Sequence, residues 1–509
     1  MEIRMSQLTG EEVSVKSYDT VVRVVVPLSA ADGARVLCAA AQPSVSLSEA
    51  LSGQIRVEGS VKCCVISAYG EQQFMSESAV SSFECNVPAE GVSARARILA
   101  SASCCDCRAA QEGSNAVVTA RIRVQVYVSD PAEAEVVTQA EGEELYTLQG
   151  VMQSTQNVGD YRARFGIKED ITLSVRLPQI DRLLCCQASP VLQQVNCDHD
   201  QILIQGTLAV NLIYACADEF EPVAQIADSI EFSKIITASG VQPGDDAILT
   251  LSAEDCIFTV EKNEEGEARI VSLECVLAAS ATAYRTEETE VVTDAYSSVS
   301  ELDMMRQRLT LNSETTLFRS RQSARISAQM PAGNPPMARI SAVIVSPCVE
   351  EVVPKNGGAV INGTAGVQVL YIASESGDFA AFSTVSEFSF TIDEPDFTPD
   401  MAVFADVRPE QIQAVLTGMN ECELHLTLAV SLAGFRSENL SVLTELSEAG
   451  AREESDCGIC IYIMQKDDTL WDVGKELGVS TEMLRQLNPE AGERPAAGTR
   501  LTVYRQIKP

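Results

Sequence analysis

Residues 201–214 read QILIQGTLAVNLIY, with apolar side chains at every second position on both sides of Gly206. Strict alternation over this many residues is typical of a long strand with one packed face and one wet face. A glycine inside a strand marks a bulge, a bend or a close approach of another chain segment. The segment therefore predicts a long, half-buried β-strand in which Gly206 has a structural role.

The same pattern occurs three times in the chain. In each copy a proline precedes the strand glycine by sixteen residues, and the copies lie 147 and 157 residues apart: Pro43/Gly59, Pro190/Gly206 and Pro347/Gly363. An alternating segment precedes each proline, an aromatic strand position (Phe83, Phe232, Phe388) follows each glycine, and a further alternating run ends each copy. Each copy thus has at least four strands and few helical patterns, which predicts a mainly β fold with three tandem β-sandwich or barrel-like repeats. We place them at residues 15–150, 165–300 and 315–444.

Length and composition agree with several globular domains. The 509 residues exceed what one hydrophobic core accommodates, and 46% of them are hydrophobic against 21% charged. The formal charge of -35 repels phosphate backbones and anionic bilayers, so we expect no nucleic-acid partner. Residues 461–509 carry seven basic and seven acidic side chains, so the repeats hold the whole excess.

The sequence offers no membrane or export signal that we recognise. Residues 1–10 lack a basic cluster followed by an apolar run, and no stretch approaches the roughly 18 apolar residues of a spanning helix. We therefore expect a cytoplasmic protein without membrane insertion. The 17 cysteines include adjacent pairs and form a poor disulfide framework, so we expect mostly reduced, buried thiols.

The three copies resemble the SPOCS domain, a family named for its occurrence in spore coat proteins of endospore-forming bacteria. The resemblance rests on the proline-to-glycine spacing and on the strand ends Leu212-Ile213-Tyr214 and Val369-Leu370-Tyr371. It covers roughly residues 15 to 450.

The composition and the pattern of the sequence change after the third repeat. Residues 445–460 are acidic and predict a solvated linker. Residues 461–504 predict the order strand, helix, helix, strand. Thr469 and Asp472 have the spacing of a capping box, Ser480 can cap the second helix, and Asn488-Pro489 ends it.

Residues 461–504 resemble the LysM family, a small α+β (βααβ) domain. The matching positions are Asp468-Thr469-Leu470-Trp471, Val479-Ser480, Leu484, Asn488-Pro489, Gly498 and Leu501. The resemblance implies binding of N-acetylglucosamine-containing glycans or of a partner through the loops before the first helix and after the second. Carried over by position, the candidate residues are Asp467, Asp468, Thr469, Leu470, Asn488 and Pro489.

One position departs from the family. Glycine is usual where this chain has Asp467, and a charged side chain there obstructs a sugar and removes the backbone freedom of glycine. We therefore predict a protein-docking module rather than a wall-glycan binder. Trp471, the only tryptophan, could stack on a sugar, but its place in the first predicted helix favours packing in the core.

The sequence contains few residues and motifs of the kinds that support catalysis. It contains two histidines, His199 and His425, neither beside a nucleophile motif, and no glycine loop for phosphate. The best metal candidate, Cys104-Cys105-Asp106-Cys107, lacks a second ligand pair. We therefore predict no enzyme activity, no cofactor and no metal site.

Three SPOCS-like repeats followed by a LysM-like module resemble SipL-type spore morphogenetic proteins. This resemblance implies a structural adaptor that docks spore coat proteins at the forespore surface on the mother-cell side. It also implies a contact between the LysM module and the basal coat ATPase, stage IV sporulation protein A. The alternative is a module that binds peptidoglycan or another N-acetylglucosamine glycan at the cell wall.

Overall fold

The computed structural model describes residues 1–29, 33–70, 73–216, 221–452, 458–492 and 494–504. The first repeat contains β1 (Glu2–Pro27), β2 (Ala34–Leu51), β3 (Gln54–Tyr69), β4 (Gln73–Pro88), β5 (Arg97–Glu112) and β6 (Asn115–Glu141). The second contains β7 (Leu145–Thr172), β8 (Ile180–Asp198), β9 (Gln201–Cys216), β10 (Val223–Thr237), β11 (Asp246–Lys262) and β12 (Ala268–Ser297). The third contains β13 (Ser300–Gln329), β14 (Met337–Lys355), β15 (Gly358–Ala373), β16 (Phe379–Asp393), β17 (Ala402–Gly418) and β18 (Glu421–Ala451).

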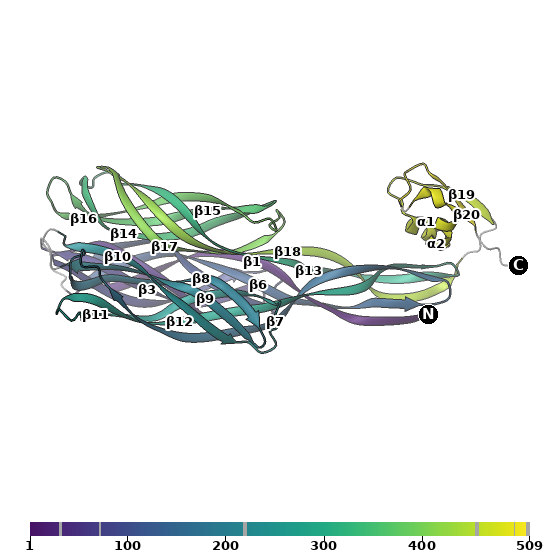
Figure 1. Ribbon diagram of the computed structural model, residues 1–509, viewed down its shortest axis with the longest axis horizontal. Helices are drawn as coiled ribbons and strands as arrows, with labels where there is room; N and C mark the ends of the chain where they lie inside the picture. The colour runs from purple at the N-terminus through teal and green to yellow at the C-terminus, as the bar shows by residue number, and fades with distance from the viewer. Residues whose placement is uncertain (30–32, 71–72, 217–220, 453–457, 493, 505–509) are drawn as a thin grey trace.

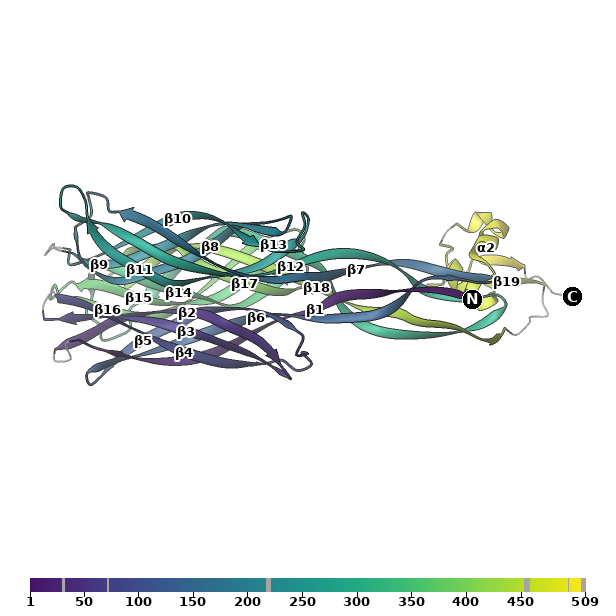
Figure 2. The same cartoon turned by 90° about the horizontal axis from the view of Figure 1, so that it is seen from below.

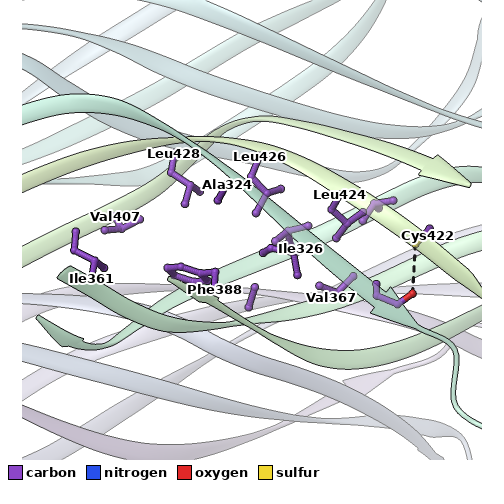
Figure 3. Packing of buried hydrophobic residues seen from close by; sticks show 14 of the residues in the cluster. Ala324, Ile326, Ile361, Val367, Phe388, Val407, Cys422, Leu424, Leu426 and Leu428 are labelled. Atoms are coloured by element: carbon purple, nitrogen blue, oxygen red, sulfur yellow. Dashed lines mark hydrogen bonds between the residues drawn. The ribbon is translucent and has the colours of Figure 1, made fainter. Parts of the chain in front are cut away.

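Each repeat is a sandwich of two three-stranded antiparallel sheets. In the second repeat the strand orders are β8-β9-β10 and β11-β12-β7, and the other repeats are built in the same way. The alternating side chains of both sheets fill the space between them, as Figure 3 shows for the third repeat around Phe388 and Leu426. The mainly β prediction is confirmed, with six strands per repeat.

The repeated glycines explain why the sequence pattern recurs. Gly206 lies directly opposite Phe232 of β10, and a Cβ added to it would lie 2.8 Å from that ring and would meet the backbone oxygen of Val191. The bulge lies on the neighbouring edge strand β8, between Leu192 and Gln194. Gly59 and Gly363 face Phe83 and Phe388 in the same way. The glycine thus provides a close approach for an aromatic ring, while the partner strand carries the bulge.

The three repeats pack around one another, since each contributes equivalent side chains to two shared clusters. One cluster joins apolar residues of the first sheet of each repeat, among them Phe74, Leu184 and Phe379. The other joins the second sheets, through residues such as Tyr127, Tyr284 and Phe435. These interfaces make the body one assembly of three sandwiches, visible side by side in Figures 1 and 2.

Buried amide side chains join neighbouring repeats. Gln368 of the third repeat donates to the carbonyl of Ala39 in the first at 2.5 Å and accepts from its amide at 2.9 Å. Gln225 of the second repeat binds the backbone of Val343 in the third, donating at 2.9 Å and accepting at 2.8 Å. Each glutamine satisfies both backbone groups of a buried residue, which fixes the register between the repeats.

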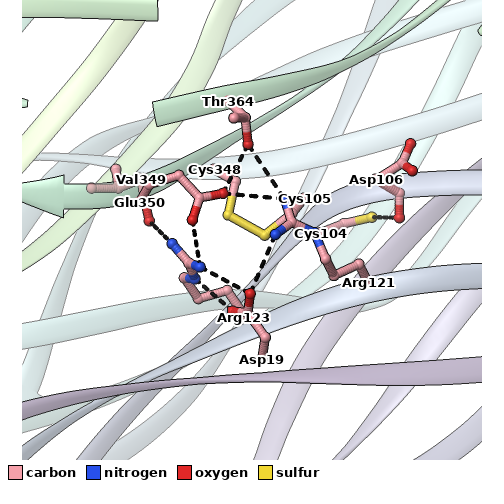
Figure 4. Close-up of a disulfide and its surroundings, with 10 residues drawn as sticks. All are labelled: Asp19, Cys104, Cys105, Asp106, Arg121, Arg123, Cys348, Val349, Glu350 and Thr364. Atoms are coloured by element: carbon pink, nitrogen blue, oxygen red, sulfur yellow. Dashed lines mark hydrogen bonds and ion pairs between the residues drawn. A yellow bond between two sulfur atoms is a disulfide. The ribbon is translucent and has the colours of Figure 1, made fainter. Parts of the chain in front are cut away.

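A disulfide between Cys105 and Cys348 links the first repeat to the third. Beside it, Arg123 donates to Asp19 at 2.6 Å and to the carbonyl of Val349 at 2.7 Å, and it also pairs with Glu350 (Figure 4). A second disulfide lies within the second repeat, between Cys256 and Cys275. The expectation of reduced cysteines is therefore wrong for these two pairs, which sequence spacing does not reveal. Of the twelve other described cysteines, seven are buried and five are half-buried.

The longest strand pairs extend beyond the sandwiches as a stalk. We define the stalk as the ends of β1, β6, β7, β12, β13 and β18 that carry two further apolar clusters, centred on Leu311 and Val292. These strand ends form three antiparallel pairs, β1 with β6, β7 with β12 and β13 with β18. Figures 1 and 2 show the pairs twisting together toward the C-terminal module, with the N-terminus at the same end. Residues 445–451, predicted as linker, instead form the end of β18 because they pair with β13 in the stalk. The linker prediction for residues 453–457 lies outside the described residues.

Candidate functional site

The C-terminal module has the predicted order of strand, helix, helix and strand. It contains β19 (Ile459–Ile463), α1 (Leu470–Leu477), α2 (Thr481–Leu487), the short 3-10 helix η1 (Pro489–Ala491) and β20 (Arg500–Tyr504). β19 and β20 pair antiparallel. Its core is one small cluster: Met464, Leu470, Val473, Val479, Leu484, Leu501 and Val503.

The predicted helix boundaries are confirmed by their caps. The Thr469 hydroxyl accepts from the amide of Asp472 at 3.2 Å, and the Asp472 carboxylate accepts from the amide of Thr469 at 2.9 Å. Ser480 accepts from the amide of Met483 at 3.0 Å and begins α2. Gly478 ends α1 with a φ of 67°, a conformation that glycine adopts without steric cost.

The loop before α1 has the backbone shape that favours glycine, although aspartate occupies it. Asp467 has a φ of 69° and is exposed. Asp468 stabilises this turn, because its carboxylate accepts from the hydroxyl of Tyr462 at 2.9 Å and from the amide of Gln465 at 2.7 Å. The turn thus carries a carboxylate at the position whose backbone shape favours glycine.

Most of the other candidate residues also have internal roles. Thr469 caps α1, and Leu470 is 4% exposed in the core. Asn488 donates to the carbonyl of Thr502 at 2.8 Å and accepts from its amide at 2.7 Å, so it ties the loop after α2 to β20. Pro489 begins η1 and is exposed. The side chains of Asp467 and Pro489 are therefore the freest of the six.

Helix α1 docks on the tip of the stalk. The ring of Trp471 lies edge-on against Tyr296 of β12, with centroids 4.8 Å apart, and its indole nitrogen donates to Asp294 at 2.8 Å. Lys475, one turn further along α1, places its ammonium 2.7 Å from both oxygens of Asp294. Trp471 therefore packs against the stalk rather than in the core of the module, where we expected it.

Tyr296 and Arg452 also join the module to the stalk at this docking contact. The hydroxyl of Tyr296 donates to the carbonyl of Val479 at 2.8 Å. Arg452, just after β18, donates to the carbonyls of Lys475 and Glu476 at 2.8 and 2.7 Å and to that of Ser297 at 3.0 Å. Its charge lies at the C-terminal end of α1, where the unpaired carbonyls and the helix dipole favour a cation.

The electrostatics of the docking contact favour an ionised Asp294. Burial raises the pKa of this carboxyl, but the hydrogen bonds from Lys475 and Trp471 outweigh it, so the pKa lies below its usual value. Burial raises the pKa of Tyr296 to about 12, which keeps its hydroxyl a donor at neutral pH.

The outward side of β19 is apolar and exposed. Alternate residues of β19 point outward: Ile459, Ile461 and Ile463 are 69%, 65% and 51% exposed. Tyr504, paired with Ile459 on β20, is 47% exposed. None of the contacts described above between α1 and the stalk involves this isoleucine face. No sequence motif marked it, although the alternation of isoleucine in residues 459–463 is its signal.

These features define a class of protein: three interlocked β-sandwich repeats that carry a small βααβ module at the tip of a β stalk. Two segments, residues 179–261 and 336–417, match the family model described as SipL, SPOCS domain. They run from β8 to β11 and from β14 to β17, the same four strands of the second and third repeats. The match supports a SipL-like, sporulation-related protein, and it confirms the predicted resemblance in these segments. No curated protein and no solved structure matches the chain.

The first repeat lies outside the matched segments but has the same construction. Its strands β2 to β5 follow the order of β8 to β11, and Gly59 faces Phe83 as Gly206 faces Phe232. Within the described residues, no helix is long and apolar enough to cross a membrane, and no group of three metal-ligating side chains is found.

Proposed function

We propose that this protein is a non-enzymatic structural adaptor in spore coat assembly, which docks partner coat proteins at the forespore surface on the mother-cell side. The observation that carries the proposal is the match of two repeats to the SipL, SPOCS domain family. A body of three sandwiches packed together, with a stalk that carries a small module at its tip, suits a scaffold, because the module lies apart from the bulk of the protein.

The proposed partner surface is the isoleucine face of β19. Exposed large apolar side chains that lie together are typical of protein contacts. The LysM-like resemblance makes the basal coat ATPase, stage IV sporulation protein A, the first partner to test. Binding of wall glycan is the weaker alternative, since Asp468, Thr469 and Asn488 are engaged within the module and Asp467 carries a charge at the turn.

Localisation in sporulating cells tests the adaptor role. The full chain fused to a fluorescent protein should form a shell around the forespore. A fusion that labels the outer cell wall instead would overturn the proposal.

Affinity capture of the full chain from sporulating cells tests the docking surface. Ile461→Asp places a charge in the centre of the isoleucine face and should reduce recovery of the coat ATPase at least tenfold. Ile235→Asp is the matched control, because Ile235 is 61% exposed on β10 of the body. If Ile461→Asp retains the partner while Asp467→Gly loses it, the contact lies in the loop before α1.

A further inference from the structure

The junction between the first and second repeats has a thiol at a position where the other two repeats have an amide, although Gln42 also donates from the first repeat to the carbonyl of Ala188 in the second at 2.7 Å. The fifth residue after each repeated glycine is Cys64, Asn211 or Gln368, and each points toward a neighbouring repeat. Gln368 binds the first repeat directly, and Asn211 accepts from Gln225, which binds the third. Cys64 contacts the carbonyl of Leu184 in the second repeat, with the sulfur 3.1 Å away.

The thiol of Cys185 completes this contact. Cys185 follows Leu184 on β8, is 3% exposed, and its thiol lies close enough to that of Cys64 to influence the pKa of both. Both belong to the apolar cluster in which the three repeats meet. Cys64 itself is half-buried, and its sulfur lies 3.1 Å from the hydroxyl of Ser76. A half-buried thiol thus lies beside a buried one from another repeat.

We propose that Cys64 and Cys185 form a reversible disulfide that joins the first and second repeats. Cys64 is the attacking residue: the hydrogen bonds from Cys185 and Ser76 hold its pKa below the usual range, and Lys62 adds to this effect. Cys185 is the resolving residue, since it is the more deeply buried of the two thiols and its contact with Cys64 and its burial both raise its pKa.

The oxidant is a small-molecule disulfide, and the two steps balance. The Cys64 thiolate attacks one sulfur of the small disulfide, forms a mixed disulfide and releases one small thiolate. The Cys185 sulfur then attacks the Cys64 sulfur, its proton passes to the departing sulfur, and the second small molecule leaves as a thiol. Two protein thiols are oxidised to one disulfide, and the small disulfide is reduced to two thiols.

The bond would reinforce a junction that is only partly filled. A groove of about 790 Å³ lies between the first two repeats, lined by β2 and β5 on one side and by β7, β11 and β12 on the other. With Cys105–Cys348 between the first and third repeats, a Cys64–Cys185 bond makes two of the three junctions covalent.

Peptide mapping of the full chain tests the proposal. The protein is reduced, equilibrated with oxidised glutathione, alkylated and digested without reductant. We expect the peptide that carries Cys64 to be joined to the one that carries Cys185. Cys64→Ser should abolish the link, and Cys185→Ser should stop the reaction at glutathione on Cys64.

Cys186→Ser is the matched control, because Cys186 is adjacent and burial raises its pKa to about 12. It should leave the link intact. Circular dichroism of each variant confirms that it folds. Glutathione on wild-type Cys64 without the internal link, a link from Cys64 to another cysteine, or an unmodified Cys64 would each overturn the proposal.

Discussion

Replacing Asp294 by alanine should release the C-terminal module from the stalk. This carboxylate is the shared acceptor of Trp471 and Lys475, and its side chain is 18% exposed. A hydrogen bond to a charged group contributes about 1.5 to 3 kcal/mol. The Lys475 side chain is 39% exposed, so solvent reduces its ion pair toward the roughly 0 to 1 kcal/mol of surface pairs. We expect a loss of about 2 kcal/mol, or roughly a 30-fold shift toward the undocked module.

The fluorescence of Trp471 reports on the equilibrium between the docked and the undocked module. Trp471 is the only tryptophan, and it lies against Tyr296 at the docking contact. In Asp294→Ala we expect its fluorescence emission to shift to longer wavelength and to become more accessible to acrylamide. Asp303→Ala, which removes an exposed acid of the stalk strand β13, is the control and should leave the emission unchanged.

The pH dependence follows from the direction of the shift. Because the docked pKa of Asp294 is below its model-peptide value of 3.8, its contribution is fully present above that value and is lost as the pH falls through the docked pKa. Acid should therefore reproduce the emission change of Asp294→Ala. An Asp294→Ala protein with wild-type emission and quenching at neutral pH would refute this account of the docking contact.

Two further predictions concern the body. Gly206→Ala places a methyl group against Phe232 and the backbone of β8, so urea unfolding should show a loss of about 1 to 3 kcal/mol. Gly166→Ala, with no atom within 4 Å of the added carbon, should lose far less, and equal losses would contradict the steric explanation. Burial raises the pKa of Glu11 above its usual value of 4.5, although Ser129 donates to its carboxylate at 2.7 Å. The contribution of Glu11 to stability is therefore fully present below pH 4.5 and is lost as the pH rises through the folded pKa. Glu11→Gln should remove this part of the pH dependence of the thermal midpoint, and an unchanged profile would assign it to other groups.

The sequence predicted the architecture because its signals are local. Alternation around Gly206 follows from the two faces of a strand, and the capping residues Thr469 and Ser480 act within three positions of themselves. For the same reason the order of elements in the C-terminal module was predictable from residues 461–504. The recurrence of one pattern three times also required no knowledge of contacts between the copies.

The candidate site was only partly predictable. The loop before α1 was located correctly, but the engagement of Asp468 and Asn488 within the module depends on partners that the fold brings near. The sequence did not predict the docking contact, because Trp471 and Asp294 are 177 positions apart and neither belongs to a motif that predicts contact with the other. The prediction that Trp471 packs in the core of the module was therefore wrong.

The sequence by itself determined the three β repeats, the βααβ module and the place of each helix end, since these depend on periodicity and on neighbours along the chain. Only the tertiary structure decided how the repeats interlock, which cysteines meet and which face of the module is covered. Those features depend on contacts such as Cys105–Cys348, 243 positions apart, whose partners are selected by packing rather than by local pattern.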